Sequence, residues 1–365
     1  MPAILLTGFP GFLASRLAGP LLDRTDAATR LVCLVQDKYR ARAERRVAKI
    51  VRQREDRDAG RIELMTGDIT EPDLALGARL RPLQQEITEI YHLAAVYDLT
   101  VSREVGTRVN VEGTRHMLHV AESCSELRRF QYVSTCYVSG RYGGLFTEDD
   151  LQKGQRFNNY YEETKYRAEV AVQRKMDEGL PATVYRPGIV VGDSETGATQ
   201  KYDGPYPLIQ WMLRWDDIVP MPALGDPATY TVNVVPCDFV VDAIAHLSGL
   251  EASEGRVYQL CDPHAPTVEE FLDTLARAAD RRFLFVPVVP GLARLSLQAV
   301  PGLAEYTGFL PDVVDYFTHP TTYNCRNVHE DLKGTGIACP PLPSYAHRLV
   351  DFMREHPDLA SETMA

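Results

Sequence analysis

Short, mainly apolar runs alternate with amphipathic stretches over the first half of the chain. The runs lack strict polar alternation, as is typical of parallel strands whose sheet is covered by helices on both faces. They lie at residues 3–6, 31–35, 62–66, 89–93, 130–134 and 182–185. Helical patterns fall between them, most clearly at residues 109–123 and 162–178. This alternation predicts an α/β fold built on a doubly wound parallel sheet.

The pattern changes after residue 193. Residues 194–226 are rich in Gly, Pro, Tyr and Trp and keep no sustained period. A helical period returns over residues 234–250, and residues 256–261 have the pattern of one more strand. From residue 263 onward we expect an acidic-capped helix, Pro-rich turns and further helices.

We therefore predict two domains. The larger one covers residues 1–193, and residues 234–262 return to it. A smaller, partly discontinuous C-terminal domain covers residues 194–233 and 263–356 and is expected to hold the substrate. Residues 357–365 are predicted to be a frayed tail.

Composition narrows the class of protein. The 365 residues are 45% hydrophobic, which is enough for a large core, and the net charge of −11 argues against a nucleic-acid partner. No run approaches the roughly 18 apolar residues of a membrane span, and no basic stretch precedes the first strand as in a signal peptide. The seven scattered cysteines contain no CxxC pair, so we expect buried thiols, no metal site and a reducing, cytoplasmic location.

The first apolar run leads directly into a glycine turn, TGFPGFLA, that opens a helix. Gly8 permits the tight turn, Gly11 lets the backbone approach a pyrophosphate, and Ala14 keeps the helix close to the sheet. The helix amino terminus offers N–H groups and the positive end of its dipole. We predict a dinucleotide cradle formed by Thr7, Gly8, Phe9, Gly11, Phe12 and Leu13.

Two later segments are predicted to belong to the same site. Asp68 and Ile69 follow a strand, and Asp68 can accept a hydrogen bond from an adenine amino group; a turn or helix-cap role is the alternative. Ala94 and Ala95 end the next strand with small side chains, which suits a backbone that grazes a dinucleotide. His92 beside them is expected to be a packed core residue rather than a catalyst.

Tyr161 and Lys165 are four residues apart in a helical stretch and therefore share one helix face. A free phenol titrates near 10, so it exchanges its proton poorly at neutral pH. We expect the Lys165 ammonium, together with an oxidised nicotinamide, to lower the pKa of Tyr161 toward the working range. Lys165 is also expected to donate to the nicotinamide ribose.

The fifth strand ends in Val133-Ser134-Thr135, at the edge of the sheet where open α/β folds bind ligands. We expect the Thr135 hydroxyl to hydrogen-bond the substrate carbonyl oxygen while Tyr161 delivers a proton. Ser134 is the alternative, because a shift of one residue reverses which side chain faces the crevice. The turn after the sixth strand is expected to offer backbone groups to the nicotinamide carboxamide through Pro187, Gly188, Ile189 and Val190.

In combination these segments resemble the extended short-chain dehydrogenase/reductase family. The matching motifs are TGFPGFLA (7–14), GDI (67–69), HLAA (92–95), VNVEGT (109–114), VST (133–135), YEETK (161–165) and RPGIVVG (186–192). The resemblance is strongest to the thioester-reductase and fatty-acyl reductase branch, which reduces acyl thioesters to aldehydes or alcohols. It implies a Rossmann-type domain, Thr135, Tyr161 and Lys165 as the catalytic trio, and Asn110 as a structural residue beside the cofactor.

The residues after the second strand depart from the branch pattern. NADPH users in the branch place an Arg there, whereas NAD users end the strand with an acid. Here Val35 is followed by Gln36 and then by Lys38, with Arg40 and Arg42 a few residues further on. Gln36 and Lys38 are expected to contact the cofactor, and the positive charges favour NADP slightly over NAD.

The region from 201 to 215 suggests an apolar substrate. Its large side chains are Tyr202, Tyr206, Trp211, Met212, Leu213 and Trp215. They can form an aromatic wall over the crevice that suits an acyl chain, or they can form the core of the second domain. We predict reduction of an apolar carbonyl, namely a thioester, an aldehyde or a ketone.

Other functions remain possible from the sequence. A nucleotide-sugar epimerase or dehydratase can use the same fold and trio, although Cys136 and Tyr137 stand where a dehydratase needs an acid. A non-enzymatic dinucleotide-binding protein is the third alternative. The sequence contains no carrier domain, so a thioester substrate is expected free or from a separate acyl-carrier partner. By analogy with the family, a homodimer is possible.

Overall fold

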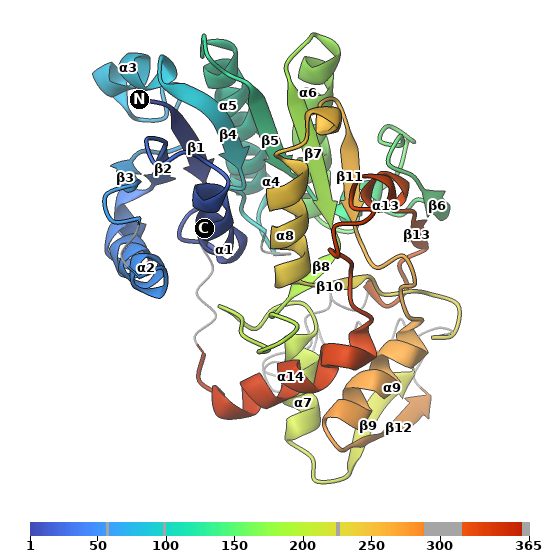
Figure 1. Ribbon diagram of the computed structural model, residues 1–365. Helices are drawn as coiled ribbons and strands as arrows, with labels where there is room; N and C mark the ends of the chain where they lie inside the picture. Colours follow the sequence, from blue (N-terminus) through green and yellow to red (C-terminus); the bar gives the residue numbers. More distant parts are fainter. Residues whose placement is uncertain (56–57, 98–99, 224–226, 288–315, 360–365) are drawn as a thin grey trace.

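The computed structural model describes residues 1–55, 58–97, 100–223, 227–287 and 316–359. Seven parallel strands form the main sheet in the order β11-β7-β5-β4-β1-β2-β3 (Figure 1). Their bounds are β1 (Ala3–Thr7), β2 (Arg30–Val35), β3 (Ile62–Thr66), β4 (Ile87–His92), β5 (Arg129–Val133), β7 (Ala182–Pro187) and β11 (Val257–Leu260). The predicted doubly wound Rossmann-type sheet is confirmed, and the predicted strand over 256–261 joins it as the edge strand β11.

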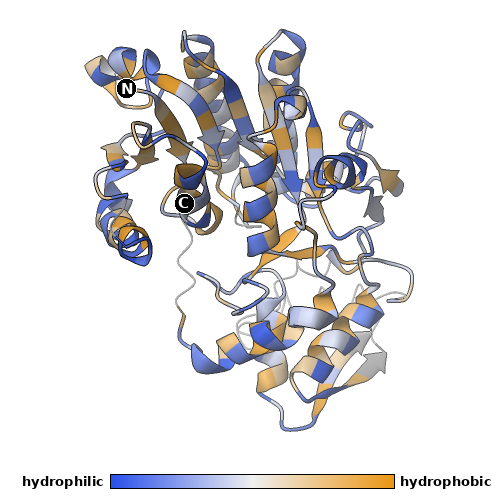
Figure 2. Ribbon diagram, viewed as in Figure 1, coloured by the Kyte–Doolittle hydropathy of each residue, from blue (hydrophilic) through white to orange (hydrophobic). Residues whose placement is uncertain are grey.

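Helices cover both faces of this sheet, as the apolar runs predict. Ile4 and Leu6 pack in one core cluster with α1, α2 and α8, whereas Ala3 and Leu5 pack in another with α3, α5 and α6. The helices are α1 (Phe12–Asp23), α2 (Arg40–Gln53), α3 (Leu80–Gln84), α4 (Arg103–Gly106), α5 (Gly113–Glu122), α6 (Tyr160–Asp177) and α8 (Cys237–Leu247). Apolar residues concentrate on the strands between these layers (Figure 2).

A third core cluster lies beyond the carboxyl ends of the strands. It gathers buried side chains from the helices α7 (Tyr206–Leu213), α9 (Val268–Ala278) and α14 (Leu342–Glu355). The strands β9 (Ile218–Ala223) and β12 (Arg282–Pro287) pair in parallel beside α9 (Figure 1). A capping box between Thr267 and Glu270 begins α9, as the acidic pattern there predicts.

Short parallel pairs join distant parts of the chain near this cluster. The strand β8 (Ile189–Val191) pairs with β10 (Val234–Pro236), and β6 (Gly144–Phe146) pairs with β13 (Thr321–Tyr323). The short helix α13 (Arg326–Asp331) follows β13 and contacts β11. The predicted domain boundaries stay a prediction, and most of the predicted tail, residues 360–365, lies outside the described residues.

The structure adds to the sequence pattern in two places. Residues 194–226 keep no sustained period in the sequence, yet they contain α7 and β9, because burial in the third core cluster outweighs the Gly and Pro content. The helix expected over residues 234–250 begins only at Cys237, since Pro236 supplies no N–H and the residues of β10 extend along β8. Among the helices of the described ranges, none has the length and apolar character needed to cross a membrane.

Candidate active site

A cavity of about 570 Å³ opens where β1, β4, β5 and β7 end. Most of the predicted site residues line it. These are Thr7, Gly8, Phe9, Gly11, Phe12, Leu13, Gln36, Asp68, Ile69, Ala94, Ala95, Ser134, Thr135, Tyr161, Lys165, Pro187, Gly188, Ile189 and Val190. The carboxyl edge of the sheet therefore brings together segments that are up to 183 residues apart, from Thr7 to Val190.

The glycine turn is held close to the neighbouring strand. Gly8 has φ +87°, and a Cβ at this position would lie 2.8 Å from the carbonyl carbon of Leu93. An L side chain is therefore excluded both by the backbone conformation and by the approach of the chain after β4. Gly11 donates its N–H to the Gly8 carbonyl at 2.7 Å and caps α1, whose amino terminus faces the cavity.

Thr7 and His92 tie the ends of β1 and β4 together. The Thr7 hydroxyl lies 2.8 Å from His92 Nδ1 and accepts hydrogen bonds from the backbone N–H groups of Leu93 and Ala94. The other His92 ring nitrogen lies 3.0 Å from the Thr114 hydroxyl. Burial lowers the pKa of His92 to about 3, so the ring is neutral, and its position is that of the expected core residue.

Asp68 and Gln36 interact at the far side of the cavity. Gln36 Nε2 donates to one carboxylate oxygen of Asp68 at 2.8 Å, and the other oxygen accepts from the N–H and hydroxyl of Thr70. Asp68 thus makes the turn contacts of its alternative role and also lines the cavity. The two predicted roles are compatible, because a carboxylate has lone pairs for further donors.

Asn110 lies in the π-helix η3 (Thr107–Glu112) and does not line the cavity. Its side-chain amide exchanges two hydrogen bonds of 2.9 Å with the backbone of Val96 and donates to the Thr164 hydroxyl at 3.0 Å. Asn110 therefore joins the segment after β4 to α6. This placement agrees with the structural role implied for Asn110. It does not support a direct contact with the cofactor, because Asn110 is not part of the cavity lining.

The helix α6 presents Tyr161 and Lys165 at its amino terminus. The Asn159 side chain caps the helix by accepting from the Glu162 N–H at 3.0 Å, which fixes where the first turn starts. Lys165 Nζ donates to the Tyr132 hydroxyl and to the Val133 carbonyl, both at 2.9 Å. Two of its three N–H donors are thus directed at β5, and Lys165 is held beside the strand that leads to Thr135.

The expected lowering of the Tyr161 pKa is not found in the chain itself. Burial raises the pKa of Tyr161 above its ordinary value, and a hydrogen bond with the Thr135 side chain opposes this only in part. Burial also lowers the pKa of Lys165 to about 7, against the opposing effect of Glu169. Lys165 is not among the groups that act on the Tyr161 pKa in the chain alone, so the lowering expected from Lys165 together with a bound nicotinamide stays a prediction.

Thr135 and Ser134 occupy distinct positions. The Thr135 side chain forms the hydrogen bond with Tyr161 and caps the turn η4 (Cys136–Ser139) by accepting from the Tyr137 N–H at 3.3 Å. The Ser134 hydroxyl instead donates to Glu169 at 2.5 Å. Of the two alternatives left by the sequence, the geometry favours Thr135 as the hydroxyl beside the phenol.

The basic residues after β2 divide between the cavity and the surface. Arg42 lines the cavity, whereas Arg40 donates to Glu44 and to the Leu64 carbonyl, and Lys38 lies 5.0 Å over the Tyr39 ring outside the lining. The pKa of Arg46 is lowered by burial and then by the like charges of Arg42 and Arg16. Three guanidinium groups therefore gather near this end of the cavity, which favours an anion there.

A family comparison identifies the chain. The family model described as Male sterility protein matches residues 6–244, from the end of β1 into α8. The chain belongs to this family of extended short-chain dehydrogenases/reductases. The resemblance inferred from the motifs is confirmed, and the fold is that of an NAD(P)-binding enzyme related to thioester and aldehyde reductases.

Relatives of this Male sterility family member are larger proteins. The chain is 29% identical over 281 residues to one of the linear gramicidin synthase subunits of Brevibacillus parabrevis, a match that covers 74% of the chain and 5% of that protein. It is 30% identical over 291 residues to glycine betaine reductase ATRR of Emericella nidulans, covering 74% of the chain and 22% of that protein. The chain thus spans a small part of the length of both relatives.

Among solved structures, the terminal R domain from the myxalamid PKS-NRPS biosynthetic pathway is similar over nearly the full chain. The TM-score is 0.82 at 26% identity, with 99% of this chain and 92% of that chain covered. The likeness therefore extends past the family motifs into the region that forms the third core cluster.

The aromatic residues of the C-terminal region are mostly core. Tyr202 lines the cavity, whereas Tyr206, Trp211 and Met212 are buried among α9 and α14. Trp215 remains partly exposed, at 36%. Of the two interpretations of these side chains, a core of the C-terminal region is therefore observed for most of them, and an aromatic wall over the cavity is not.

Other residues of this reductase family member line the cavity without having been predicted from the sequence. Lys201 Nζ pairs with Asp203 at 2.8 Å and lies 3.5 Å over the Tyr97 ring. Tyr137 lines the cavity next to Tyr316, the two rings meeting edge to face at 4.8 Å. Lys201, Asp203 and Tyr97 lie in irregular segments and Tyr137 lies in the short turn η4, and none of them belongs to a motif with a recognisable spacing.

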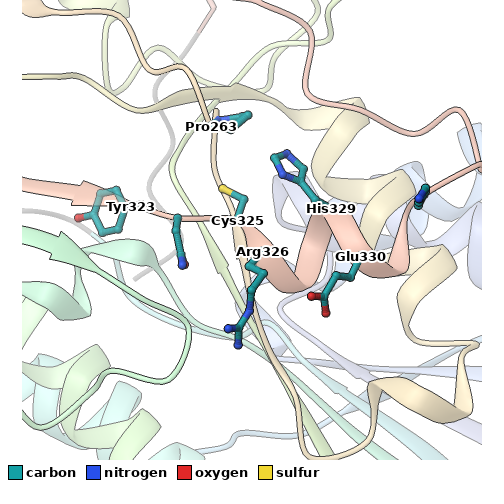
Figure 3. Close-up of a pocket in the computed structure, with 8 residues that line it drawn as sticks. Pro263, Tyr323, Cys325, Arg326, His329 and Glu330 are labelled. Carbon is teal, nitrogen blue, oxygen red and sulfur yellow. The ribbon is translucent and has the colours of Figure 1, made fainter.

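A second hollow of about 520 Å³ lies along α13 (Figure 3). Its lining includes Pro263, Cys325, Arg326 and His329, and no residue of the predicted site. Burial raises the pKa of Cys325 to about 12, so the thiol at this hollow is unreactive at neutral pH. The predicted site residues that line a cavity therefore lie at the first cavity and not at this hollow.

Proposed function

We propose that the chain is an NADPH-dependent reductase of apolar acyl thioesters or aldehydes, with Thr135, Tyr161 and Lys165 as its catalytic residues. The observation that carries this proposal is their arrangement at one cavity. The Thr135 and Tyr161 side chains are hydrogen-bonded to each other, and Lys165 lies on the same helix face. The α1 amino terminus lines the same cavity and is suited to a pyrophosphate.

The raised pKa of Tyr161 suits reduction. The phenol keeps its proton at neutral pH and is therefore a proton donor to a carbonyl oxygen that becomes negatively charged. Thr135 donates a second hydrogen bond to that oxygen and orients it. Lys165 stabilises the phenolate left behind, and its remaining N–H is suited to a ribose hydroxyl. The bound nicotinamide supplies the hydride.

With a thioester, hydride adds to the carbonyl carbon and the oxygen takes the Tyr161 proton, which gives a hemithioacetal. The carbon–sulfur bond then breaks, the thiolate takes up a proton as a thiol, and an aldehyde remains. This reduction consumes one hydride, and therefore two electrons, which a bound NADPH would supply. A second hydride and proton reduce the aldehyde to an alcohol, so both products are consistent with one set of residues.

The walls of the cavity beyond the trio favour an apolar substrate. Their apolar part includes Ile189, Val232, Val234, Phe271 and Phe317, and the Lys201–Asp203 ion pair is a polar part of the same lining. An apolar lining with few polar groups suits an acyl chain and offers little to the several hydroxyls of a nucleotide sugar. Cys136 is fully buried next to Thr135, so it is not an acid poised for dehydration.

NADPH is proposed over NADH because of Arg42. Its side chain lines the cavity on the side of Gln36 and Asp68, near the like charges of Arg16 and Arg46. A 2′-phosphate would relieve the repulsion among these guanidinium groups and accept their hydrogen bonds. This shifts the proposed phosphate contact from Lys38, which lies outside the cavity, to Arg42.

We also propose that the substrate is delivered on an acyl-carrier partner. The relative from Brevibacillus belongs to a synthase, and the matched segment is a small part of it. A thioester-bound acyl chain is the form in which a separate carrier would present a substrate to this cavity.

The test is a substrate panel read at the nicotinamide absorbance. Medium- and long-chain acyl thioesters and the matching aldehydes should oxidise NADPH, whereas nucleotide sugars should give no turnover or interconversion. Product analysis for thiol and aldehyde or alcohol checks the reaction balance. Interconversion of nucleotide sugars without net cofactor oxidation would replace this proposal with an epimerase.

A further inference from the structure

Glu169 is a buried carboxylate on the catalytic face of α6. It lies four residues after Lys165 and eight after Tyr161, so the three side chains share one face of the helix. Both Glu169 and its partner Arg186 are 0% exposed. Burying two charges costs free energy unless each charge is fully paired. The hydrogen-bond partners of Glu169 and Arg186 therefore show which parts of the fold the pair connects.

The contacts of Glu169 reach the ends of two strands. One carboxylate oxygen accepts from the Ser134 hydroxyl at 2.5 Å, at the end of β5. The other accepts from Arg186 Nε and Nη2 at 2.9 and 2.7 Å, near the end of β7, and from Gln173 at 2.9 Å. Each strand end continues directly into a segment that lines the cavity, through Thr135 after β5 and Pro187 in β7.

Glu169 also supplies a charge that the other neighbours of Lys165 do not. Lys165 is surrounded by Tyr132 on β5, His92 on β4 and Tyr161 on α6. Burial raises the pKa of both tyrosines and lowers the pKa of His92 to about 3, so all three are neutral near pH 7. Among the described groups, Glu169 is the acid that acts on the Lys165 ammonium.

We propose that Glu169 is a positioning residue for the reduction: it ties the ends of β5 and β7 to α6 and places a carboxylate one helical turn from Lys165, on the helix face that also carries Tyr161. The inference rests on the proposed function. Glu169 does not line the cavity, so it touches neither substrate nor cofactor and acts through Lys165 and the strand ends. In this proposal the hydrogen bond from Ser134 to Glu169 fixes the position of Thr135, the next residue in the chain.

The test uses the full chain with Glu169→Gln, which removes the charge and keeps the shape. A matched control is Glu148→Gln. Glu148 is a buried carboxylate that also interacts with Arg186, but it accepts from the backbone of Gln259 and Asn327, away from Lys165. Both variants lose a buried carboxylate near the same arginine, and only Glu169→Gln changes a residue one helical turn from the lysine.

The first readout is competitive labelling of Lys165 with acetic anhydride across pH, followed by mass spectrometry. Only the free amine reacts, so the pH of half-maximal labelling reports when the ammonium loses its proton. We expect Glu169→Gln to lower this midpoint by about one pH unit, the size typical of removing a close opposite charge. Glu148→Gln should leave the midpoint within about 0.3 units. A midpoint unmoved in Glu169→Gln overturns the inference.

The second readout is the pH profile of kcat. The profile should fall as pH rises through the Lys165 midpoint, and Glu169→Gln should move that fall to lower pH by the same amount. If Glu169→Gln does not fold because Arg186 is left unpaired, the double variant Glu169→Gln, Arg186→Gln removes both charges and should show the same shift. If the labelling midpoint shifts in Glu169→Gln but the parent chain does not turn over thioesters, only the proposed function is overturned. If the parent chain turns over thioesters but the midpoint does not shift in Glu169→Gln, only the role of Glu169 is overturned.

Discussion

At one end of the cavity the polar side chains are bonded to one another within the fold, whereas the other end is formed by irregular segments and apolar walls. Thr7 joins His92, and Lys165 joins Tyr132, through direct hydrogen bonds between neighbouring elements of the sheet layer. The irregular segments contribute the Lys201–Asp203 ion pair and the Tyr97 ring beneath Lys201, and Asp203 is close enough to act on the Tyr161 phenol. The first end is therefore rigid enough to hold a reaction geometry, and the second is the part that can vary with the substrate.

The proposed catalytic residues and the residues proposed to select the substrate are held in place in different ways. Residues of the first end follow buried strands and helix starts, where backbone hydrogen bonds fix their positions. Residues of the second end depend on how the segment 199–207 packs over the sheet edge. The proposed chemistry should thus be sensitive to single atoms at the first end and tolerant at the second.

Tyr161→Phe tests this contrast with the largest expected effect. Removal of the phenolic oxygen removes the proton donor, so kcat should fall about 10³-fold, within the range found for general acids. The NADPH dissociation constant, measured by fluorescence titration, should change less than about threefold, because the cradle at Gly8 and Gly11 is untouched. Activity within about tenfold of the parent chain would refute the assignment of Tyr161.

Thr135→Val and Ser134→Ala form a matched pair. The valine keeps the shape of Thr135 but donates no hydrogen bond to the carbonyl oxygen, so kcat should fall about 10²-fold. Ser134→Ala removes a contact to Glu169 outside the reacting atoms and should lower kcat by less than about fivefold, roughly the value of one hydrogen bond. The assignment is reversed if Ser134→Ala is the more damaging change in steady-state kinetics.

Arg42→Ala should separate the two cofactors. Loss of a charged hydrogen-bond donor to a 2′-phosphate should weaken NADPH binding about tenfold to hundredfold and leave NADH binding unchanged. Arg40→Ala is the control, because that guanidinium is engaged by Glu44 and Leu64. Calorimetry with both cofactors measures the difference, and equal losses for NADPH and NADH in Arg42→Ala would contradict the proposed phosphate contact.

Lys201→Met carries the smallest expected effect and probes the variable end. The change removes the ion pair with Asp203 and the contact over Tyr97, and it should raise KM for the acyl substrate about threefold with kcat nearly unchanged. Initial rates over a range of substrate concentrations separate the two constants. A fall in kcat as large as that of Thr135→Val would mean that the two ends are not distinct.

The sequence predicted the first end well, because its signals are local. A buried strand, a glycine turn and a helix start follow one another within residues 3–23, so the cradle at Gly8 and Gly11 needed no distant partner to be recognised. The four-residue spacing of Tyr161 and Lys165 likewise determines that both lie on one helix face. The alternation of strands and helices was sufficient to predict a parallel sheet.

Other features depended on contacts across the fold. Thr135 and Ser134 could not be told apart by position, because the outcome rests on where the side chains of Tyr161 and Glu169 lie after α6 packs on β5. Lys165 was expected to lower the pKa of Tyr161, but burial of both groups governs their titration, and burial is a property of the packed layers.

Neighbours a few residues away were sufficient to predict the α/β class, the glycine turn after β1 and the shared helix face of Tyr161 and Lys165. Packing of distant segments determined that Arg42 rather than Lys38 lines the cavity, that Tyr206, Trp211 and Met212 form a core, and that Glu169 lies fully buried against Arg186 and Ser134. These outcomes arise from packing between segments far apart in the chain, which periodicity and spacing do not encode.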